Sequence, residues 1–402
     1  MDRLARLREH VEAAVEVPRD LLLRRYPPFV TGGPLPPGHV PVFCFHGLEP
    51  ESFGRKLAYL ADNGYSTLSA DEYFAVVSGR RAPPDRAVVL TFDDGRSSVR
   101  TVGWPLMRRH GFKGIVFVVP GRTVSRPGPL PPTLDDVEAG RATLAQLLDR
   151  EEGRDAFLAW EEIQQLDASG LFDFQSHSLS HARVHVAPDL VGFLEPSLRG
   201  GYGPLDVPLV AHEGRDLFAP EAPLGAPLLR FAPRLGEVRR FHEDGALTRA
   251  CAEHVAEQGG ERFFERPDWP AALRALAGRI PVTGRLESED ERVAAVRREL
   301  VEARALLEQR LGRPALDLCY PWHVAGPTAR RLAREAGYRS AYCGKVRGVP
   351  ITLPGGDPLR LARVGEDYVE LLPGRGRGRL GDILRSKLSR RLRAARASRG
   401  VR

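Results

Sequence analysis

The chain has 402 residues, of which 42% are hydrophobic and 28% are charged, and its formal net charge at pH 7 is +7. This composition is typical of a soluble globular protein, and the length allows either one large domain with an insertion or two domains. No stretch reaches the roughly 18 apolar residues of a membrane span. The four cysteines stand singly, which excludes a disulfide framework or a zinc knuckle.

The N-terminal segment, residues 1–37, is expected to be a helical stretch followed by a linker. Residues 2–25 place Leu, Val and Ala at helical spacing among Arg and Glu, which predicts one or two amphipathic helices. These helices could either pack on the domain or bind a surface. The start is charged and has no apolar core of a signal peptide, so we expect a cytoplasmic protein.

A series of buried strands and amphipathic helices follows the linker. Ser69 opens a Ser-x-x-Glu capping box, which predicts the start of a helix. Apolar runs and helical periodicity predict the other elements. They are strands at 40–46, 87–92 and 115–119, and helices at 51–63, 105–110 and from residue 160 to about 169.

The strand at 87–92 ends in Asp93, Asp94 and Gly95. Two adjacent carboxylates at the end of a buried strand repel each other and resist desolvation, so they need a compensating cation. The glycine permits a tight turn that would lift both carboxylates out of the sheet. An ordinary Asp-Gly turn is the alternative interpretation of this stretch alone.

A second strand, at 172–176, runs into His177-Ser178-Leu179-Ser180-His181. Histidines at positions i and i+4 share one face if the turn is helical. Two neutral imidazoles and one carboxylate leave an open coordination position, which is typical of catalytic zinc. Together with the Asp-Asp pair, these histidines predict a metal site.

Here the chain resembles the polysaccharide deacetylases, carbohydrate esterase family 4 with the NodB-homology fold. Residues 91–95 and 177–181 are similar to the first two motifs of that family, and the third motif, Arg-x-Pro-Tyr, has an altered counterpart in Cys319-Tyr320-Pro321-Trp322. The resemblance implies an α/β fold, a distorted (β/α)7 barrel, with its chemistry at the carboxyl ends of the strands. Its two parts would be residues 38–184 and 285–373.

Between these parts, residues 185–284 are rich in Pro, Gly, Arg and Glu and do not continue the barrel pattern. An insertion of this length beside a site is usually a lid or a substrate platform, although a surface extension is the alternative. The insertion is expected to cover the mouth of the barrel, because it starts four residues after His181. The barrel would then resume with a helix at 287–311, a strand at 316–320, a helix at 327–336, a strand at 339–343 and a last segment at 359–364.

The resemblance also implies residue roles. Asp94, His177 and His181 would hold a divalent metal ion, zinc above all, and Asp93 would be the general base. The backbone N–H of Trp322 would stabilise the oxyanion. Cys319 stands where the family usually has an arginine that orients the base, and a thiol cannot replace that charge.

The general acid that protonates the leaving amine is the least defined role. No histidine follows His323, so the late Leu-x-His motif of most members is missing. Some members place this histidine on the first strand, where this chain has His46. His46 is therefore the expected acid, and His323 and His185 are the alternatives.

These features predict a metal-dependent hydrolase that removes an N-acetyl group from an amino sugar or glycan, with a lipid- or nucleotide-linked precursor among the candidate substrates. A deformylase or cyclic-amide hydrolase of the same fold is an alternative within enzymes. A non-catalytic glycan-binding barrel is the alternative outside them, and the presence of Asp93 argues against it.

The C-terminal tail, residues 374–402, holds eleven Arg or Lys and one acid, so its charge is +10 and the rest of the chain carries −3. The residues Leu380, Ile383, Leu384, Leu388 and Leu392 fall on one helical face. Such a basic amphipathic helix suits an anionic membrane surface, so peripheral membrane contact is predicted. A disordered solubilising tail is the alternative, and nucleic-acid binding is the least expected role.

Overall fold

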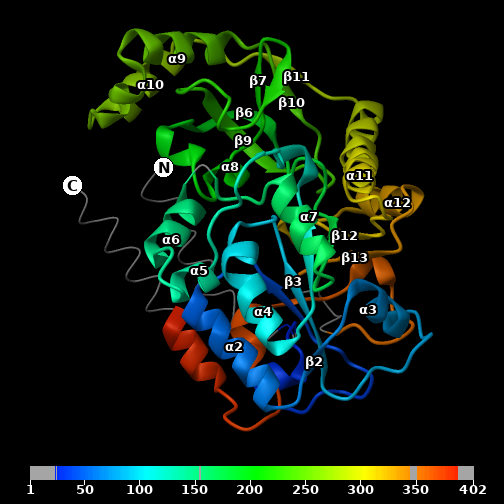
Figure 1. Cartoon of the computed structure of the whole chain (residues 1–402). Helices are drawn as coiled ribbons and strands as arrows, with labels where there is room; N and C mark the ends of the chain where they lie inside the picture. The colour runs from blue at the N-terminus through cyan, green and yellow to red at the C-terminus, as the bar shows by residue number, and fades with distance from the viewer. Residues whose placement is uncertain (1–22, 24, 154, 345–350, 388–402) are drawn as a thin grey trace.

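The computed structural model describes residues 23, 25–153, 155–344 and 351–387 (Figure 1). The helices expected at 2–25 therefore lie outside the described residues, apart from residues 23 and 25. One sheet dominates the structure, and all its strand pairs are parallel. Its strands are β1 (Val42–Phe45), β2 (Ser66–Thr67), β3 (Ala87–Phe92), β4 (Gly114–Val118), β5 (Phe172–Ser176), β12 (Asp317–Cys319), β13 (Ser340–Tyr342) and β14 (Val364–Gly365).

Seven of these strands lie side by side in the order β13-β12-β5-β4-β3-β1-β14, while β2 pairs with β3 beside them. Strand β14 pairs with β1, at Phe43 and Val364. Just before β14, Leu361 forms a parallel bridge to Tyr342 of β13. One short segment thus joins the last strand to the first and closes the sheet. The expected distorted (β/α)7 barrel is confirmed.

Helices connect the strands and pack on the outside of the barrel (Figure 1). The capping box predicted at Ser69 is present, since its side chain accepts from the N–H of Glu72. The helices of the barrel are α2 (Pro50–Asp62), α3 (Ala70–Val77), α4 (Trp104–His110), α5 (Leu134–Glu138), α6 (Leu144–Glu152), α7 (Trp160–Ala168), α11 (Glu289–Leu311) and α12 (Pro327–Glu335).

The strand side chains alternate between two buried clusters, as a period of two requires. Phe43, Val88 and Leu90 belong to the larger cluster, together with residues of the surrounding helices. Val42 and Val89 belong to a second cluster that includes residues of β4, β12 and β13. The second cluster fills the inside of the barrel. Polar side chains at the strand ends that share the alternation of this second cluster therefore also point inward.

Residues between β5 and α11 form a separate layer on the barrel, shown in green at the top of Figure 1. Three antiparallel strand pairs and three helices make up this insertion. The strands are β6 (Arg183–Phe193), β7 (Val210–His212), β8 (Arg215–Leu217), β9 (Pro227–Pro233), β10 (Phe241–Glu243) and β11 (Gly284–Leu286), and the helices are α8 (Gly203–Asp206), α9 (Ala246–Glu257) and α10 (Trp269–Ala277).

The insertion contacts loops that follow the carboxyl ends of barrel strands. Tyr202 lies on Arg96, which comes after β3. Phe218 lies on Arg122, which comes after β4. Leu235 accepts a hydrogen bond from the N–H of Gly326, which comes after β12. These contacts place the insertion at the end of the barrel where its strands terminate.

The described part of the tail is attached to the barrel. Residues 380–387 are helical, and Leu380, Ile383 and Leu384 pack against the main core. Before this helix, the guanidinium of Arg377 donates to the backbone oxygens of residues 29, 32, 33 and 371. The apolar face predicted for this part of the tail is therefore covered by the protein itself. Residues 388–402, with Leu388 and Leu392, lie outside the described chain.

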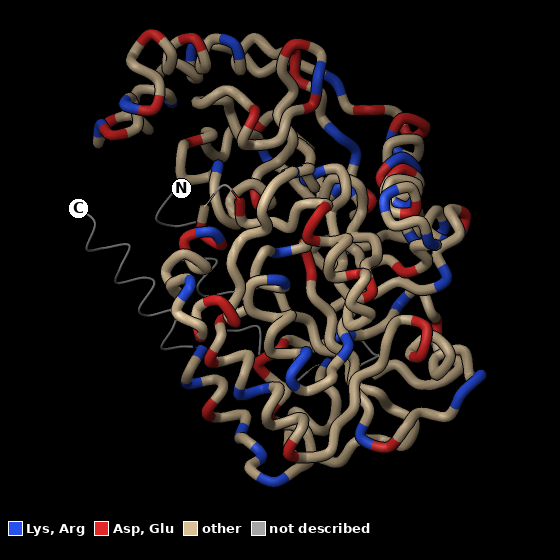
Figure 2. Tube along the Cα trace, in the orientation of Figure 1, with Lys and Arg blue, Asp and Glu red and all other residues tan. Residues whose placement is uncertain are grey.

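Charged residues are spread over helices and loops, and α11 is dense in both signs (Figure 2). In the part of the chain that the structure describes, none of the helices combines the length and the apolar character needed to cross a bilayer.

Candidate active site

Asp93 and Asp94 follow the last residue of β3 and are almost fully buried. Asp94 takes a left-handed backbone, with φ of 68°, which is uncommon for a residue with a side chain. The turn continues through Gly95, whose φ is 67°. The two carboxylates can therefore serve different partners, although they are adjacent in sequence.

His177 and His181 follow β5 and face Asp94. The Nε2 atoms of the two histidines lie 3.4 and 3.6 Å from Asp94 Oδ1. The ring centroids of the histidines are 4.9 Å apart. His181 also takes a left-handed backbone, with φ of 53°. The structure thus brings together the three residues expected to bind a metal.

The donor set fits a divalent ion. Metal–ligand bonds of about 2.1 Å at tetrahedral angles separate ligand atoms by roughly 3.4 Å, close to the observed spacing. His177 Nδ1 lies 2.8 Å from the carbonyl oxygen of Cys319, so Nδ1 carries the proton and Nε2 is free to bind. His181 Nδ1 is buried without a hydrogen-bond partner. Burial lowers the pKa of His181 to about 3, which keeps this imidazole neutral, as a ligand must be.

Asp93 is bound by an arginine that the sequence analysis did not identify. Arg363 donates from Nη1 to Asp93 Oδ1 and from Nη2 to Oδ2, both at 2.7 Å. The remaining donors of this fully buried guanidinium reach Thr91 Oγ1, the Cys343 carbonyl and the Cys319 sulfur. Burial alone would raise the pKa of Asp93, but the charge and hydrogen bonds of Arg363, together with the neighbouring histidines, hold this pKa well below its usual value.

Arg363 supplies the charge that Cys319 lacks. It lies on the segment that closes the barrel between β13 and β1, two residues after Leu361, and its side chain points inward. The Cys319 thiol lies 2.9 Å from Arg363 Nη2 and 3.6 Å from Asp93 Oδ2. An arginine at position 319 would compete with Arg363 for the same carboxylate. One signal in the sequence was available: an arginine at inward parity in the last barrel segment.

The histidines considered for the general acid lie in different places. His46 follows β1 and is half exposed, with its Nε2 4.0 Å from Asp93 Oδ2. His323 Nδ1 lies 3.3 Å from Arg363 Nη2. His46, His323 and Arg363 line one pocket of about 390 Å³. His185 lies elsewhere, because it is buried in the β6–β9 pair, where its Nε2 accepts from the N–H of Leu229.

Trp322 follows β12 and reaches residues 177–181, the metal-motif loop. Its ring lies 4.8 Å from the His181 ring, and the guanidinium carbon of Arg183 lies 3.6 Å from the Trp322 ring. The backbone of Trp322 is left-handed, with φ of 58°. Such strained conformations concentrate at functional sites.

Asp93 and the three candidate metal ligands of this site lie in a segment that is similar to known proteins. A family model described as polysaccharide deacetylase matches residues 80–190, which include both aspartates and both histidines. Residues 80–190 of this chain are thus similar to the polysaccharide deacetylases.

Two curated family members share local similarity with this chain. YxkH of Bacillus subtilis, named as a candidate polysaccharide deacetylase, is 25% identical over 91 residues, or 21% of this chain and 33% of YxkH. The poly-β-1,6-N-acetyl-D-glucosamine N-deacetylase of Escherichia coli is 27% identical over 134 residues, or 33% of this chain and 18% of that enzyme. The chain therefore spans a third or less of the curated relatives it matches.

Solved structures of deacetylases are also similar over most of the chain. The deacetylase domain of BpsB from Bordetella bronchiseptica is 17% identical with a TM-score of 0.49, covering 83% of this chain and 98% of that one. IcaB from Ammonifex degensii is 16% identical with a TM-score of 0.45, covering 83% and 95%.

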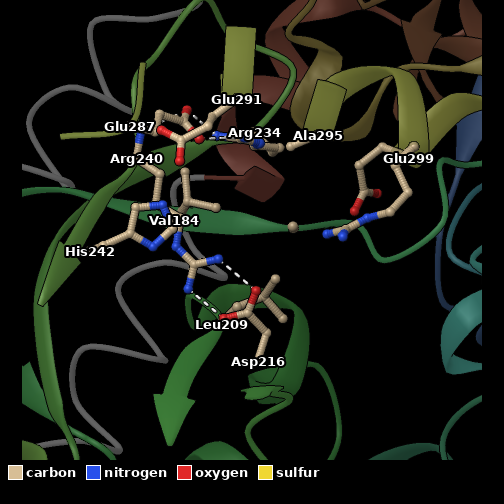
Figure 3. Close-up of a pocket in the computed structure, with 12 residues that line it drawn as sticks. Val184, Leu209, Asp216, Arg234, Arg240, His242, Glu287, Glu291, Ala295 and Glu299 are labelled. Atoms are coloured by element: carbon tan, nitrogen blue, oxygen red, sulfur yellow. Dashed lines mark hydrogen bonds and ion pairs between the residues drawn. The ribbon is translucent and has the colours of Figure 1, made fainter. Parts of the chain in front are cut away.

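Behind the loop of residues 177–181, a cavity of about 240 Å³ lies between the insertion and α11 (Figure 3). Its charges are largely paired: Arg234 with Glu287, and Arg240 with Asp216. Glu299, on its right in Figure 3, accepts from the Ser180 N–H at 3.0 Å and from the Ser180 hydroxyl. Helix α11 thus holds the loop between the two histidines, and the paired charges join the insertion to that helix.

Proposed function

We propose that this protein is a metal-dependent hydrolase that removes an N-acetyl group from an amino sugar or glycan. One observation carries the proposal: Asp94, His177 and His181 converge with ligand spacing, while Asp93 beside them is held by Arg363. A protein that only bound a metal or a glycan would not need the second carboxylate and its buried guanidinium. The similarity of residues 80–190 to the polysaccharide deacetylases supports the same reaction class.

Asp94, His177 and His181 would hold the ion, with zinc the preferred metal. When bound, zinc would polarise the amide carbonyl and lower the pKa of a water molecule. Asp93 accepts the proton of the attacking water. Arg363 fixes both oxygens of that carboxylate and keeps it ionised before the reaction starts. The carbonyl oxygen of Cys319 fixes the tautomer of His177.

His46 donates the proton to the leaving amine. Its imidazole is half exposed and lies near Asp93 Oδ2, so it can exchange protons with solvent between turnovers. His323 is the weaker candidate, since its Nδ1 faces the guanidinium of Arg363, and a cationic imidazole would be repelled there. His185 is excluded from this role by its place in the insertion. The backbone N–H of Trp322 is the proposed oxyanion donor.

An N-acetylated carbohydrate is the proposed substrate, and the name of the E. coli relative suggests N-acetylglucosamine units. We further propose a cytoplasmic site of action on a lipid- or nucleotide-linked precursor, with the basic residues after 387 touching an anionic membrane. The high density of Arg in residues 388–402 supports this contact, whereas nucleic acid is not a proposed partner.

The test is acetate release from N-acetylglucosamine, its oligomers and its nucleotide-linked form, with chelated and zinc-reloaded protein. The proposal predicts release that disappears on chelation and returns with zinc. Acetate release that survives complete removal of metal would contradict it, as would the absence of hydrolysis on all three substrate classes.

A further inference from the structure

Tyr202 of the insertion lies at the mouth of the barrel with an exposed ring. Its exposed fraction is 42%, which makes it the most exposed aromatic side chain among the described residues. Tyrosine is enriched at binding surfaces, because its ring offers an apolar face and its hydroxyl a polar end.

The inner side of the Tyr202 ring rests on a buried cation. The guanidinium carbon of Arg96, a side chain with no exposed surface, lies 3.0 Å from the centroid of the ring. Arg96 follows the metal-ligand candidate Asp94 by two residues. Arg96 Nη1 is buried without a hydrogen-bond partner, so the cation–π contact is a principal interaction on that side of the guanidinium.

The hydroxyl end of Tyr202 is also fixed. It donates to Glu151 Oε1 at 3.3 Å, and the same carboxylate accepts from Arg96 Nε at 3.0 Å and from the Ser97 hydroxyl at 2.7 Å. The hydroxyl occupies the space beside Gly47, where a Cβ would collide with it. Gly47 directly follows His46. The ring edge is thus anchored next to the proposed general acid.

The chain around Tyr202 is tied to the metal-motif loop as well. Arg122 donates from Nη1 to the carbonyl oxygen of Pro204 at 2.9 Å and from Nε to that of Ser180 at 2.7 Å. Gly201 donates to the Gly153 carbonyl at 2.9 Å. A ring held in this way loses little conformational entropy when it binds a ligand.

We propose that Tyr202 is a substrate-binding residue whose open face stacks on a sugar ring next to the one that is deacetylated. The axial C–H groups of a pyranose form an apolar face, which matches a flat ring anchored from behind. His46 and Gly47 line the pocket that also contains Arg363, so a ring on Tyr202 would lie beside that pocket. This inference rests on the proposed function and assigns to one residue of the insertion the contact with the neighbouring sugar.

The experiment compares Tyr202→Leu and Tyr202→Trp with wild type on N-acetylglucosamine and its trimer. Leucine keeps an apolar cover over Arg96 without an aromatic face, and tryptophan keeps a face. We expect Tyr202→Leu to raise KM for the trimer by about tenfold, with kcat and the monosaccharide KM unchanged, and Tyr202→Trp to stay near wild type. Val191→Ala, an exposed apolar residue of the same insertion, is the matched control.

Binding of the trimer to the zinc-loaded Asp93→Asn protein, measured by calorimetry, separates this inference from the proposed function. If the wild-type protein hydrolyses no substrate, the proposed function fails. Weaker trimer binding in the Tyr202→Leu background would still support the role of Tyr202 as a sugar-binding residue. A Tyr202→Leu protein that matches Val191→Ala in both trimer KM and trimer affinity would overturn the inference. Equal losses on monosaccharide and trimer would also overturn it.

Discussion

Arg363 and Asp93, which are 270 residues apart in sequence, form a two-point ion pair inside the barrel. Both side chains are buried, so neither charge would be tolerated without the other. The pair explains how a chain with Cys319 in its third motif can still orient an ionised carboxylate. The positive charge that Cys319 cannot supply comes from the last barrel segment and reaches Asp93 beside the Cys319 thiol.

Replacing Arg363 by Met should leave Asp93 buried without its cation. Removing one partner of a buried pair costs about 3–5 kcal/mol of unfolding free energy, and the disordered carboxylate should lower kcat by about 100-fold or more. Chemical unfolding and acetate release measure the two effects. Arg360→Met, on the same segment, is the control. Wild-type kcat in Arg363→Met would show that the ion pair has no role in catalysis.

His46→Ala should lower kcat by about 100-fold for a sugar amide, because the leaving amine is expelled without a proton. The loss should shrink on an activated amide whose leaving amine is weakly basic, such as an acetanilide with a nitro group. His185→Gln, which alters a histidine of the insertion, should keep the wild-type rate on both. An unchanged rate in His46→Ala would transfer the acid role to His323.

Acid should destabilise the protein partly through His185. Burial lowers the pKa of His185 to about 4, below the value of about 6.5 expected in the unfolded chain. The unfolded state therefore binds the proton first, and stability that is complete above pH 6.5 is lost as the pH falls to about 4. The contribution is about 3 kcal/mol. In urea unfolding, His185→Gln should flatten the slope of stability between these pH values, and an unaltered slope would contradict the assignment.

The two parts of the basic tail should behave differently on truncation. Deleting residues 374–402 exposes the core surface under Leu380, Ile383 and Leu384 and should cost about 2–4 kcal/mol. Deleting residues 388–402 alone should leave the unfolding free energy unchanged and should abolish sedimentation with anionic vesicles at low salt. Equal vesicle binding by the full chain and the shorter deletion would remove the proposed membrane contact.

The resemblance of the motifs to a known family was sufficient to predict the barrel. The positions of Asp93, Asp94, His177 and His181 after strands then predicted their clustering, because the strand ends of a parallel barrel meet at one rim. Arg363 was not predicted, because inward parity in the last barrel segment was its one signal, and parity does not name the partner of a long-range ion pair. The left-handed backbones of Asp94, His181 and Trp322 depend on surrounding packing and were equally hidden. The amphipathic pattern of residues 380–384 predicted an apolar face that needs a partner. The pattern could not show that the partner is the core of the barrel itself.

The two adjacent aspartates are proposed to have different roles: Asp94 binds the metal, and Asp93 accepts the proton of the attacking water. The most direct measurement is zinc content together with acetate release from an N-acetylglucosamine oligomer for wild type, Asp93→Asn and Asp94→Asn. We predict one zinc per chain in wild type and in Asp93→Asn, with release lost in the latter, and loss of both zinc and release in Asp94→Asn. An Asp93→Asn protein that keeps wild-type release, or an Asp94→Asn protein that keeps its zinc, would contradict the account.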